Sequence, residues 1–390
     1  MIFNTFDYYF FFLIPAALAF KLSPLPWRPW VIVLSACFFY VYFSLLGFGG
    51  VVGAFCLSIF LWESIFSRLY RPGAAICFIG VVQSVIFLAI FKYWNYLTGL
   101  AWSATSANPW HWSGAFLPLG ISFFTFEFIH YAVDRYRGKT SAGAVKEYLA
   151  FILFFPTLVA GPIKRYEDFL PKLRAAEASW LDLQTGFTRI LVGLVKKFAV
   201  ADLMTAFTNH LNAADIAIAD RRVLPLWLFA YGIKIYFDFA GYSDIAIGSA
   251  RVFGIVVPEN FDWPYMRSNI ADFWRNWHIS LSTWLFDYVF IPLGGSRVAR
   301  LRNYSNLIVT MFISGVWHGA GTNFIVWGLW HGMLLTGNRV WRDLRGARQV
   351  STVGRLIGWA ITFTTVNLGW AFFCMDLPTA RFFFQRLLIG

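Results

Sequence analysis

The sequence predicts an all-α integral membrane protein with about nine to eleven transmembrane helices, joined in places by re-entrant or interfacial helices. Hydrophobic residues make up 58% of the 390 residues and charged residues only 13%, about half of the charged share in soluble proteins. Apolar runs of about 20 residues recur along the chain, and each is long enough to cross a bilayer. A soluble domain of this size cannot bury so much apolar surface, so lipid must cover much of it.

The positive charge of the chain indicates its orientation in a membrane. The formal net charge is +12, and the Lys and Arg residues lie in short loops between the apolar runs. Such loops mark the cytoplasmic side, so we expect no nucleic-acid partner. The four cysteines show no CxxC spacing, and we expect them to pack as small hydrophobic residues.

The first part of the chain predicts five spans. They are the apolar runs 5–20, 29–46, 51–66, 74–94 and 113–133. Basic residues follow the first, third and fifth runs, whereas the loop 95–112 carries no charge. With the basic loops on the cytoplasmic side, the N-terminus and the loop 95–112 are external.

The run 148–163 breaks this alternation, because Lys164 and Arg165 follow it and also belong on the cytoplasmic side. The run is short and contains Pro156. We therefore expect a re-entrant segment, which enters the membrane and returns. Irregular backbone at membrane depth survives only where it is buried in protein or lines a wet cavity, so this segment implies an internal chamber.

The rest of the chain predicts two further spans at 186–207 and 223–248, a hairpin at 304–336 and a last span at 356–374. Residues 251–303 mix polar, aromatic and several arginine residues, and we expect them at the cytoplasmic surface, partly dipping into the membrane. The sequence shows no internal repeat or linker, so we expect a single domain over residues 1–390.

Six histidines are the first candidates for chemistry. His111 and His210 lie in polar or uncharged loops, where a solvated surface role is the simpler interpretation. His130 lies late in the fifth predicted span, and we expect it to be buried and hydrogen-bonded.

His278, His318 and His331 stand apart from these. His278 lies in a stretch too polar for lipid and too aromatic for open water, whereas His318 and His331 lie in Trp-His-Gly units within the apolar hairpin. An ionisable group inside a membrane run is costly and is a functional candidate by default. Small residues around His318, including Gly315 and Gly319, would let a substrate come close.

These residue types suit acyl transfer from a thioester to an alcohol. Imidazole can take the hydroxyl proton at neutral pH, and a second histidine, Arg, Trp N–H or Asn can stabilise the oxyanion. The sequence has no GxSxG elbow and no Cys–His arrangement, so direct attack by the acceptor is the simplest route. The alternative is that His318 and His331 are packing residues bonded to backbone carbonyls. No metal is expected, because neither histidine has a second ligand at helical spacing.

Two aspartates lie six residues apart near the end of the span 223–248. Asp238 and Asp244 could line a polar tunnel or bond to neighbouring backbone, and the residues alone leave both readings open. Lys196 and Lys197 follow an apolar stretch and are expected to extend towards the membrane surface.

Several motifs in order carry a family resemblance. They are FFPTLVAGPIKRYEDFLPKL (154–173), YFDFAGYSDIAIGSARVFGI (236–255), PENFDWPYMRSNIADFWRNWHISLSTWLFDYVFIPLGGSR (258–297) and SGVWHGAGTNFIVWGLWHG (314–332). The sequence resembles the membrane-bound O-acyltransferase family over nearly its whole length, and most of all the bacterial alginate O-acetyltransferase branch.

The resemblance implies a helical fold around a central funnel or tunnel, with a catalytic core at about 115–335, in the bacterial inner membrane. Catalytic roles carry over to His318 and His278. Substrate-binding candidates are Arg275, Trp317, Asp244, Asn276 and His331.

The resemblance also implies the partners. The expected donor is a cytoplasmic acyl thioester, usually acetyl-CoA or otherwise an acyl carrier protein, used as a substrate with no permanently bound cofactor. The expected acceptor is an extracytoplasmic polysaccharide, reached with the help of a separate extracytoplasmic acetyltransferase.

Two other functions remain open. D-alanyl transfer from a carrier protein towards teichoic acid would use the same chemistry with a different donor. A transporter would also place ionisable residues in the membrane, but transporters of that kind show broken helices in two internal repeats, which this sequence lacks.

The orientation can be tested by labelling. In a variant whose native cysteines are replaced, Thr105→Cys should react with an impermeant maleimide added to intact cells, because the uncharged loop faces outside. Reaction only after the cells are permeabilised would reverse the assigned orientation.

Overall fold

The computed structural model describes residues 2–47, 50–102, 110–112, 117–346 and 349–389. Within these ranges the regular structure is helical, and the only β pairing is an isolated bridge between Phe261 and Trp277. The predicted all-α class is therefore confirmed. Residue 105, chosen for labelling, and residues 113–116 of the fifth predicted span lie outside the described residues.

The described chain divides into two compact units, each with its own hydrophobic core. Unit 1 comprises residues 1–194 and 242–258, and unit 2 comprises residues 195–241 and 259–390. The long helix α13 (Leu224–Val252) contributes residues to both. The expectation of one domain with a catalytic core at about 115–335 stays a prediction.

The helices of unit 1 follow the predicted spans. They are a π-helix Tyr8–Leu13 leading into α1 (Ile14–Leu22), α2 (Arg28–Gly47), α3 (Gly50–Phe66), α4 (Ile76–Leu88), a second π-helix Ala89–Tyr93, α5 (Trp94–Ala101), α6 (Ile121–Tyr136), α7 (Val145–Ile152), α8 (Phe155–Leu158), α9 (Tyr166–Arg174) and α10 (Trp180–Val195). Three boundaries were predicted wrongly. Helix α10 starts at Trp180, before the predicted residue 186. The fourth span continues to Ala101, because its apolar pattern persists, and α6 starts only at Ile121, after Pro118 and a left-handed Gly120.

The predicted re-entrant segment is irregular and buried. Residues 148–158 are all buried, and α7 ends at Ile152 before the short α8, which carries Pro156. Next to it, Lys164 forms a buried ion pair with Glu127 and lies over the Phe151 ring at 4.6 Å. Protein thus surrounds this backbone, as irregular structure at membrane depth requires. Its entry into a membrane stays a prediction.

Unit 2 carries the remaining helices. They are a π-helix Lys196–Ala201, α11 (Thr205–Thr208), α12 (Ala213–Ile218), part of α13, α14 (Ile270–Asn276), α15 (Ile279–Leu285), a π-helix Phe286–Phe290, α16 (Arg300–His318), α17 (Thr322–Arg345), α18 (Thr352–Cys374) and α19 (Leu377–Leu388). Its core is aromatic and includes the fully buried Trp327 and Trp370.

Exposed apolar side chains give the helices lipid-facing surfaces. Along α4, Phe78, Ile79, Val85 and Ile86 are each at least half exposed. Monomeric soluble proteins do not leave such stripes in water, so lipid is the natural cover. Three stretches are long and apolar enough to cross a membrane, namely Leu25–Tyr42, Ile76–Ala101 and Thr352–Cys374. They support a membrane protein, and the predicted total of nine to eleven spans stays a prediction.

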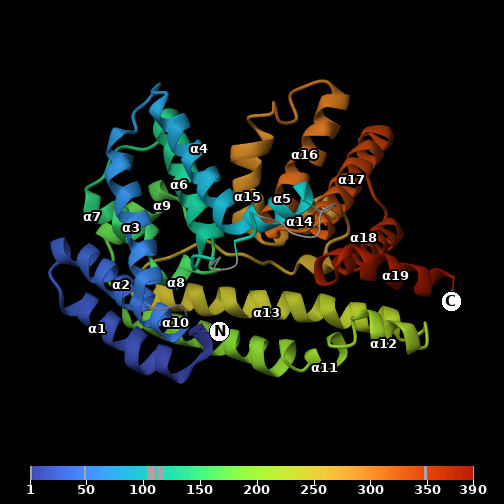
Figure 1. Ribbon diagram of the computed structural model, residues 1–390, viewed down its shortest axis with the longest axis horizontal. Helices are drawn as coiled ribbons and strands as arrows, with labels where there is room; N and C mark the ends of the chain where they lie inside the picture. The colour runs from blue at the N-terminus through green and yellow to red at the C-terminus, as the bar shows by residue number, and fades with distance from the viewer. Residues whose placement is uncertain (1, 48–49, 103–109, 113–116, 347–348, 390) are drawn as a thin grey trace. The chain divides into compact units, whose positions relative to one another are not determined.

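The predicted hairpin is present as α16 and α17, which lie side by side (Figure 1). Their contact depends on glycine. A Cβ atom on Gly328 would lie 2.4 Å from the Met311 carbonyl oxygen, and one on Gly315 would lie 3.0 Å from the Gly328 Cα. Small residues at such crossings let two helix backbones approach closely. The hairpin is longer than the predicted range 304–336. Helix α16 starts earlier, at Arg300, and helix α17 ends later, at Arg345.

A pair of glycine variants tests this packing. Gly328→Ala should lower the unfolding free energy by about 1–3 kcal/mol, because the added methyl group overlaps backbone on α16. Gly337, on the same helix, has open space at its Cβ position. Gly337→Ala should therefore be neutral or stabilise the helix by up to about 1 kcal/mol. Thermal unfolding in detergent measures both, and equal effects would contradict the close approach.

Candidate active site

Unit 2 brings His278, His318 and His331 into one aromatic cluster, although 53 residues separate the first from the last in sequence. The Trp317 ring lies 6.3 Å from the His278 ring and 4.7 Å from the His318 ring, centroid to centroid. The Trp327 ring lies 4.8 Å from His318 and 4.9 Å from His331. Three of the predicted site histidines and Trp317 therefore share one site.

His278 is held in a strained backbone conformation between α14 and α15. Its φ is 43°, in the left-handed region, which costs a residue other than glycine about 1–3 kcal/mol. Asn260 holds the neighbouring residues, because its carbonyl accepts from the Ile279 N–H at 2.9 Å and its side-chain oxygen accepts from the Ser280 hydroxyl at 2.6 Å. Strain that the surroundings enforce in this way is typical of functional positions.

The His278 ring is buried against aromatic neighbours. It is 2% exposed and lies 4.7 Å from the Phe239 ring, edge to face. Burial lowers the pKa of His278 to about 3, so the ring is neutral at physiological pH. Its Nε2 has no hydrogen-bond partner among the described residues. A neutral imidazole with a nitrogen free of protein partners can polarise or position a substrate group.

His318 is the last residue of α16 and is only half-buried. The rings of Trp317, Trp327 and Phe373 surround it, the last at a centroid distance of 5.2 Å. The turn that follows is Gly319-Ala320-Gly321, before α17 begins at Thr322. Of the three histidines in the cluster, His318 therefore has the most exposed ring, next to a turn with little side-chain bulk.

His331 is fully buried, and the described residues offer neither of its ring nitrogens a hydrogen-bond partner. The alternative that it is a packing residue bonded to carbonyls is therefore not what the structure shows. An unsatisfied buried polar group costs about 1–3 kcal/mol. Its neighbours Trp274 and Trp327 also bury indole N–H groups without a partner among the described residues.

A cavity of about 520 Å³ in unit 2 reaches this cluster at Trp274. Its wall comes from α14, α15, the Phe286–Phe290 π-helix, α16 and α17, and contains three arginines, Arg275, Arg339 and Arg342. Arg275 is largely exposed and pairs with Asp272 at 2.6 Å. The predicted candidate Asn276 is not among the lining residues of the cavity, and its side-chain amide donates to the Asp272 carbonyl at 2.7 Å.

Sequence reasoning missed Trp274, Trp327, Arg339 and Arg342 as site residues. In the sequence these arginines served only as markers of the cytoplasmic side, and Trp N–H groups were offered as oxyanion donors without Trp274 or Trp327 being assigned. The spacing of the two arginines could have indicated that they belong to the site, since Arg339 and Arg342 follow His331 by about two and three helical turns. What the sequence could not show is that α14 packs against α17 and so adds Trp274 and Arg275 to the same wall.

The two aspartates of α13 are ion-paired and belong to different units. Asp244 lies in unit 1 and accepts from the Arg189 guanidinium, so the structure does not add it to the histidine cluster of unit 2. Its role in substrate binding stays a prediction. Asp238 lies in unit 2 and pairs with Lys197 at 2.7 Å. Two carboxylates, Asp238 and Asp202, hold the Lys197 ammonium group, and its extension to the membrane surface stays a prediction.

The remaining histidines lie outside the aromatic cluster. His210 is half exposed and pairs with Asp215 at 2.9 Å, and His111 is exposed, both as predicted. His130 is buried, and its Nε2 accepts from the Tyr166 N–H at 3.1 Å.

His130, Asp134 and Glu167 form a cluster whose potential ligand atoms lie within 4.8 Å of one another. Because Nε2 of His130 already accepts a hydrogen bond, a neutral ring carries its proton on Nδ1. Neither nitrogen then offers a lone pair to a cation. The hydrogen bond from the Tyr166 N–H to His130 joins the start of α9 to α6.

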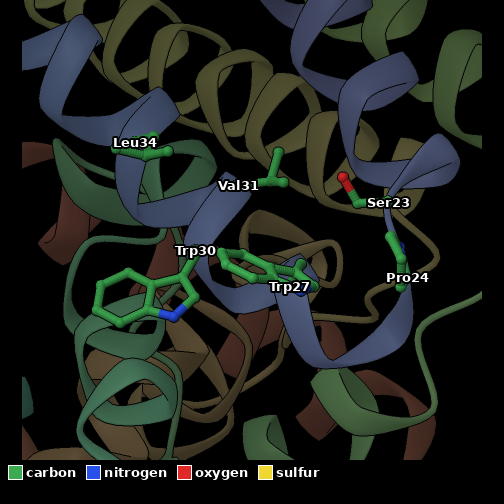
Figure 2. Close-up of a pocket in the computed structure, with 6 residues that line it drawn as sticks. All are labelled: Ser23, Pro24, Trp27, Trp30, Val31 and Leu34. Carbon is green, nitrogen blue, oxygen red and sulfur yellow. The ribbon is translucent and has the colours of Figure 1, made fainter.

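A second pocket, of about 450 Å³, lies in unit 1 at the start of α2. Figure 2 shows the indoles of Trp27 and Trp30 beside Val31 and Leu34, with Ser23 and Pro24 from the preceding turn. None of these residues titrates near neutral pH. The pocket suits apolar contact and offers no group for proton transfer.

Comparison with known proteins identifies the family of the chain. The sequence pattern of the membrane-bound O-acyltransferase family matches residues 72–374, which contain all three histidines of the cluster. The chain is 40% identical to the probable alginate O-acetylase of Pseudomonas aeruginosa over 76% of this chain, and spans 56% of that relative's length. It is 36% identical to the corresponding protein of Azotobacter vinelandii, over 96% of this chain and 75% of the relative.

A third relative differs in its named activity. The peptidoglycan O-acetyltransferase of Helicobacter pylori is 33% identical, over 91% of this chain and 72% of the relative. The match to the family pattern and the identity to these relatives both cover most of the chain. The chain therefore belongs to the membrane-bound O-acyltransferase family.

Proposed function

We propose that this protein transfers an acyl group, in the first instance acetyl, from a thioester donor to a hydroxyl group of a polysaccharide. The observation that carries the proposal is the half-buried His318 within the aromatic cluster of unit 2, next to two other histidines and a cavity with basic walls. Relatives named as alginate O-acetylases and as a peptidoglycan O-acetyltransferase support this reaction and this class of acceptor.

The chemistry assigns His318 the role of general base. The acceptor oxygen attacks the thioester carbonyl carbon and forms the new C–O bond, while the hydroxyl proton passes to His318. The carbonyl oxygen gains charge and needs hydrogen-bond donors. The tetrahedral intermediate then collapses, the C–S bond breaks, and the proton moves from His318 to the leaving sulfur.

His278 has a supporting role in this proposal. Its ring is neutral, buried and separated from His318 by the Trp317 ring. It can therefore orient the donor or acceptor without competing for the transferred proton. A fixed, strained backbone at this position keeps the ring in one place, which the precise alignment of reacting groups requires.

The cavity of unit 2 suits the donor. Arg275, Arg339 and Arg342 provide charged hydrogen-bond donors for phosphate groups, and Trp274 and Phe290 provide apolar wall for the pantetheine arm. The donor is a substrate, and the proposal needs no permanently bound cofactor. Acetyl-CoA and a charged carrier protein share this arm, so the donor assay below separates them.

The proposed setting is the bacterial inner membrane, crossed several times, with the donor inside and the polysaccharide outside. The basic end of the α16–α17 hairpin, with Arg300 and Arg345, supports a cytoplasmic position for the cavity mouth. We further propose a central tunnel and a separate extracytoplasmic acetyltransferase that assists transfer to the polysaccharide, so that the purified protein alone transfers the acyl group more slowly.

Replacing the base tests the function directly. Purified protein in lipid nanodiscs should transfer labelled acetyl from acetyl-CoA to an oligosaccharide acceptor, and His318→Gln should lose about 10²–10⁴-fold in rate. Glutamine keeps the size of the side chain but cannot take a proton near neutral pH.

His210→Gln is the matched control, because His210 is an exposed histidine paired with Asp215, and its rate should stay near that of the wild type. Transfer by folded His318→Gln above about a tenth of the wild-type rate would contradict the assigned role. Transfer only from a charged carrier protein would identify the D-alanyl type of donor.

The donor cavity is tested by charge removal. Arg342→Gln should raise the KM for acetyl-CoA about tenfold or more with little change in kcat, because a charge-assisted hydrogen bond to phosphate is lost before the chemical step. Arg355→Gln is the control, since Arg355 is an exposed arginine outside the cavity wall. An equal rise in KM for both variants would show that general charge, and not the cavity, binds the donor.

A further inference from the structure

Five indole N–H groups of unit 2 form two contrasting sets. Three of them donate to protein oxygens: Trp330 to the Thr365 carbonyl at 3.0 Å, Trp359 to the Tyr265 carbonyl at 2.9 Å and Trp370 to the Tyr265 hydroxyl at 3.0 Å. The N–H groups of Trp274 and Trp327 are buried and have no acceptor among the described residues. Buried Trp N–H groups usually find a partner, so these two need an explanation.

The two unpaired indoles lie around one histidine. The ring centroids of Trp274 and Trp327 are 5.7 Å apart, and they lie 5.1 Å and 4.9 Å from that of His331. Both nitrogens of His331 are also without a partner among the described residues, and its ring is fully buried. Four unsatisfied nitrogens thus belong to three mutually contacting rings.

This group of three rings adjoins both the donor cavity and the proposed base. Trp274 lines the cavity of about 520 Å³, and Trp327 lies 4.8 Å from the His318 ring, centroid to centroid. Ring contacts from Trp274 to Trp327 and from Trp327 to His318 therefore link the cavity wall to the proposed base.

We propose that the indole N–H groups of Trp274 and Trp327 and the N–H of a neutral His331 bind the carbonyl oxygen of the acyl thioester. This proposal rests on the proposed function. All three groups are donors, and a carbonyl oxygen accepts two hydrogen bonds in the ground state and more strongly as an oxyanion. Because the donors are preformed in a dry site, they stabilise the charge that develops when the acceptor hydroxyl attacks and the C–O bond forms.

Substitution of Trp by Phe separates this role from packing, because it removes the N–H and keeps an aromatic ring. Trp274→Phe and Trp327→Phe should each lower kcat for acetyl transfer roughly tenfold to a hundredfold, with a smaller change in KM. Their melting temperatures should stay close to that of the wild type, since no protein hydrogen bond is lost.

Trp330→Phe is the matched control, because it removes an N–H that donates to Thr365. It should lower the melting temperature and leave kcat within about twofold of the wild type. Wild-type kcat in folded Trp274→Phe and Trp327→Phe would overturn the proposal while leaving the role of His318 intact. Absence of transfer by the wild type from any thioester would instead contradict the proposed function itself.

A binding experiment gives a readout apart from activity. S-acetonyl-pantetheine keeps the carbonyl but cannot transfer an acyl group, and S-propyl-pantetheine has the same three-carbon chain without the carbonyl oxygen. The wild type should bind the acetonyl compound about tenfold more tightly, and Trp274→Phe and Trp327→Phe should lose much of that preference. Equal binding of both compounds by the wild type would show that the Trp274, Trp327 and His331 nitrogens do not bind the carbonyl oxygen, and would overturn the proposal.

Discussion

The close approach of α16 and α17 is the contact on which the proposed site depends. Gly315 and Gly328 let the two backbones meet, and no other residue fits there without displacing one of them. The consequence is that Trp317 and His318 at the end of α16 lie beside Trp327 and His331 on α17. The proposed base and its surroundings are therefore positioned by helix packing, and a rigid scaffold of this kind holds geometry better than a loop.

Four residues of the proposed site in unit 2 are in conformations or surroundings that lower the stability of the fold. His278 has a left-handed backbone, and His331, Trp274 and Trp327 bury polar atoms without partners among the described residues. Each feature is unfavourable by itself, and together they lie in one cluster. Departures from ordinary packing that gather in one place indicate function, because selection for stability alone would remove them.

Much of the fold could be predicted from the sequence. Long apolar runs gave the positions of α2, α3, α13 and α18 to within a few residues, because hydrophobic length is a strong local signal. The break near Pro156 and the α16–α17 hairpin also followed from local sequence. The start of α6 was missed, because it depends on the turn at Pro118 and Gly120 rather than on hydrophobicity.

The candidate site could be predicted only in part. An ionisable side chain in apolar surroundings is unfavourable, and this cost pointed to His278, His318 and His331 in the sequence. The structure brings all three together. Asp244 was a further candidate with both readings open, and its partner Arg189, 55 residues away, could not be assigned from spacing. The role of Trp274 was not visible either, because an indole N–H that lacks a partner is a property of tertiary packing.

The central claim is that the acyl group is transferred within the histidine–tryptophan cluster of unit 2. A cryo-EM structure with bound S-acetonyl-coenzyme A tests it most directly. We expect the pantetheine arm in the cavity lined by Arg275, Arg339 and Arg342, with the carbonyl oxygen within about 3.5 Å of a donor from Trp274, Trp327 or His331. An arm that binds elsewhere, for example in the apolar pocket at Trp27 and Trp30, or a carbonyl remote from His318, would contradict it.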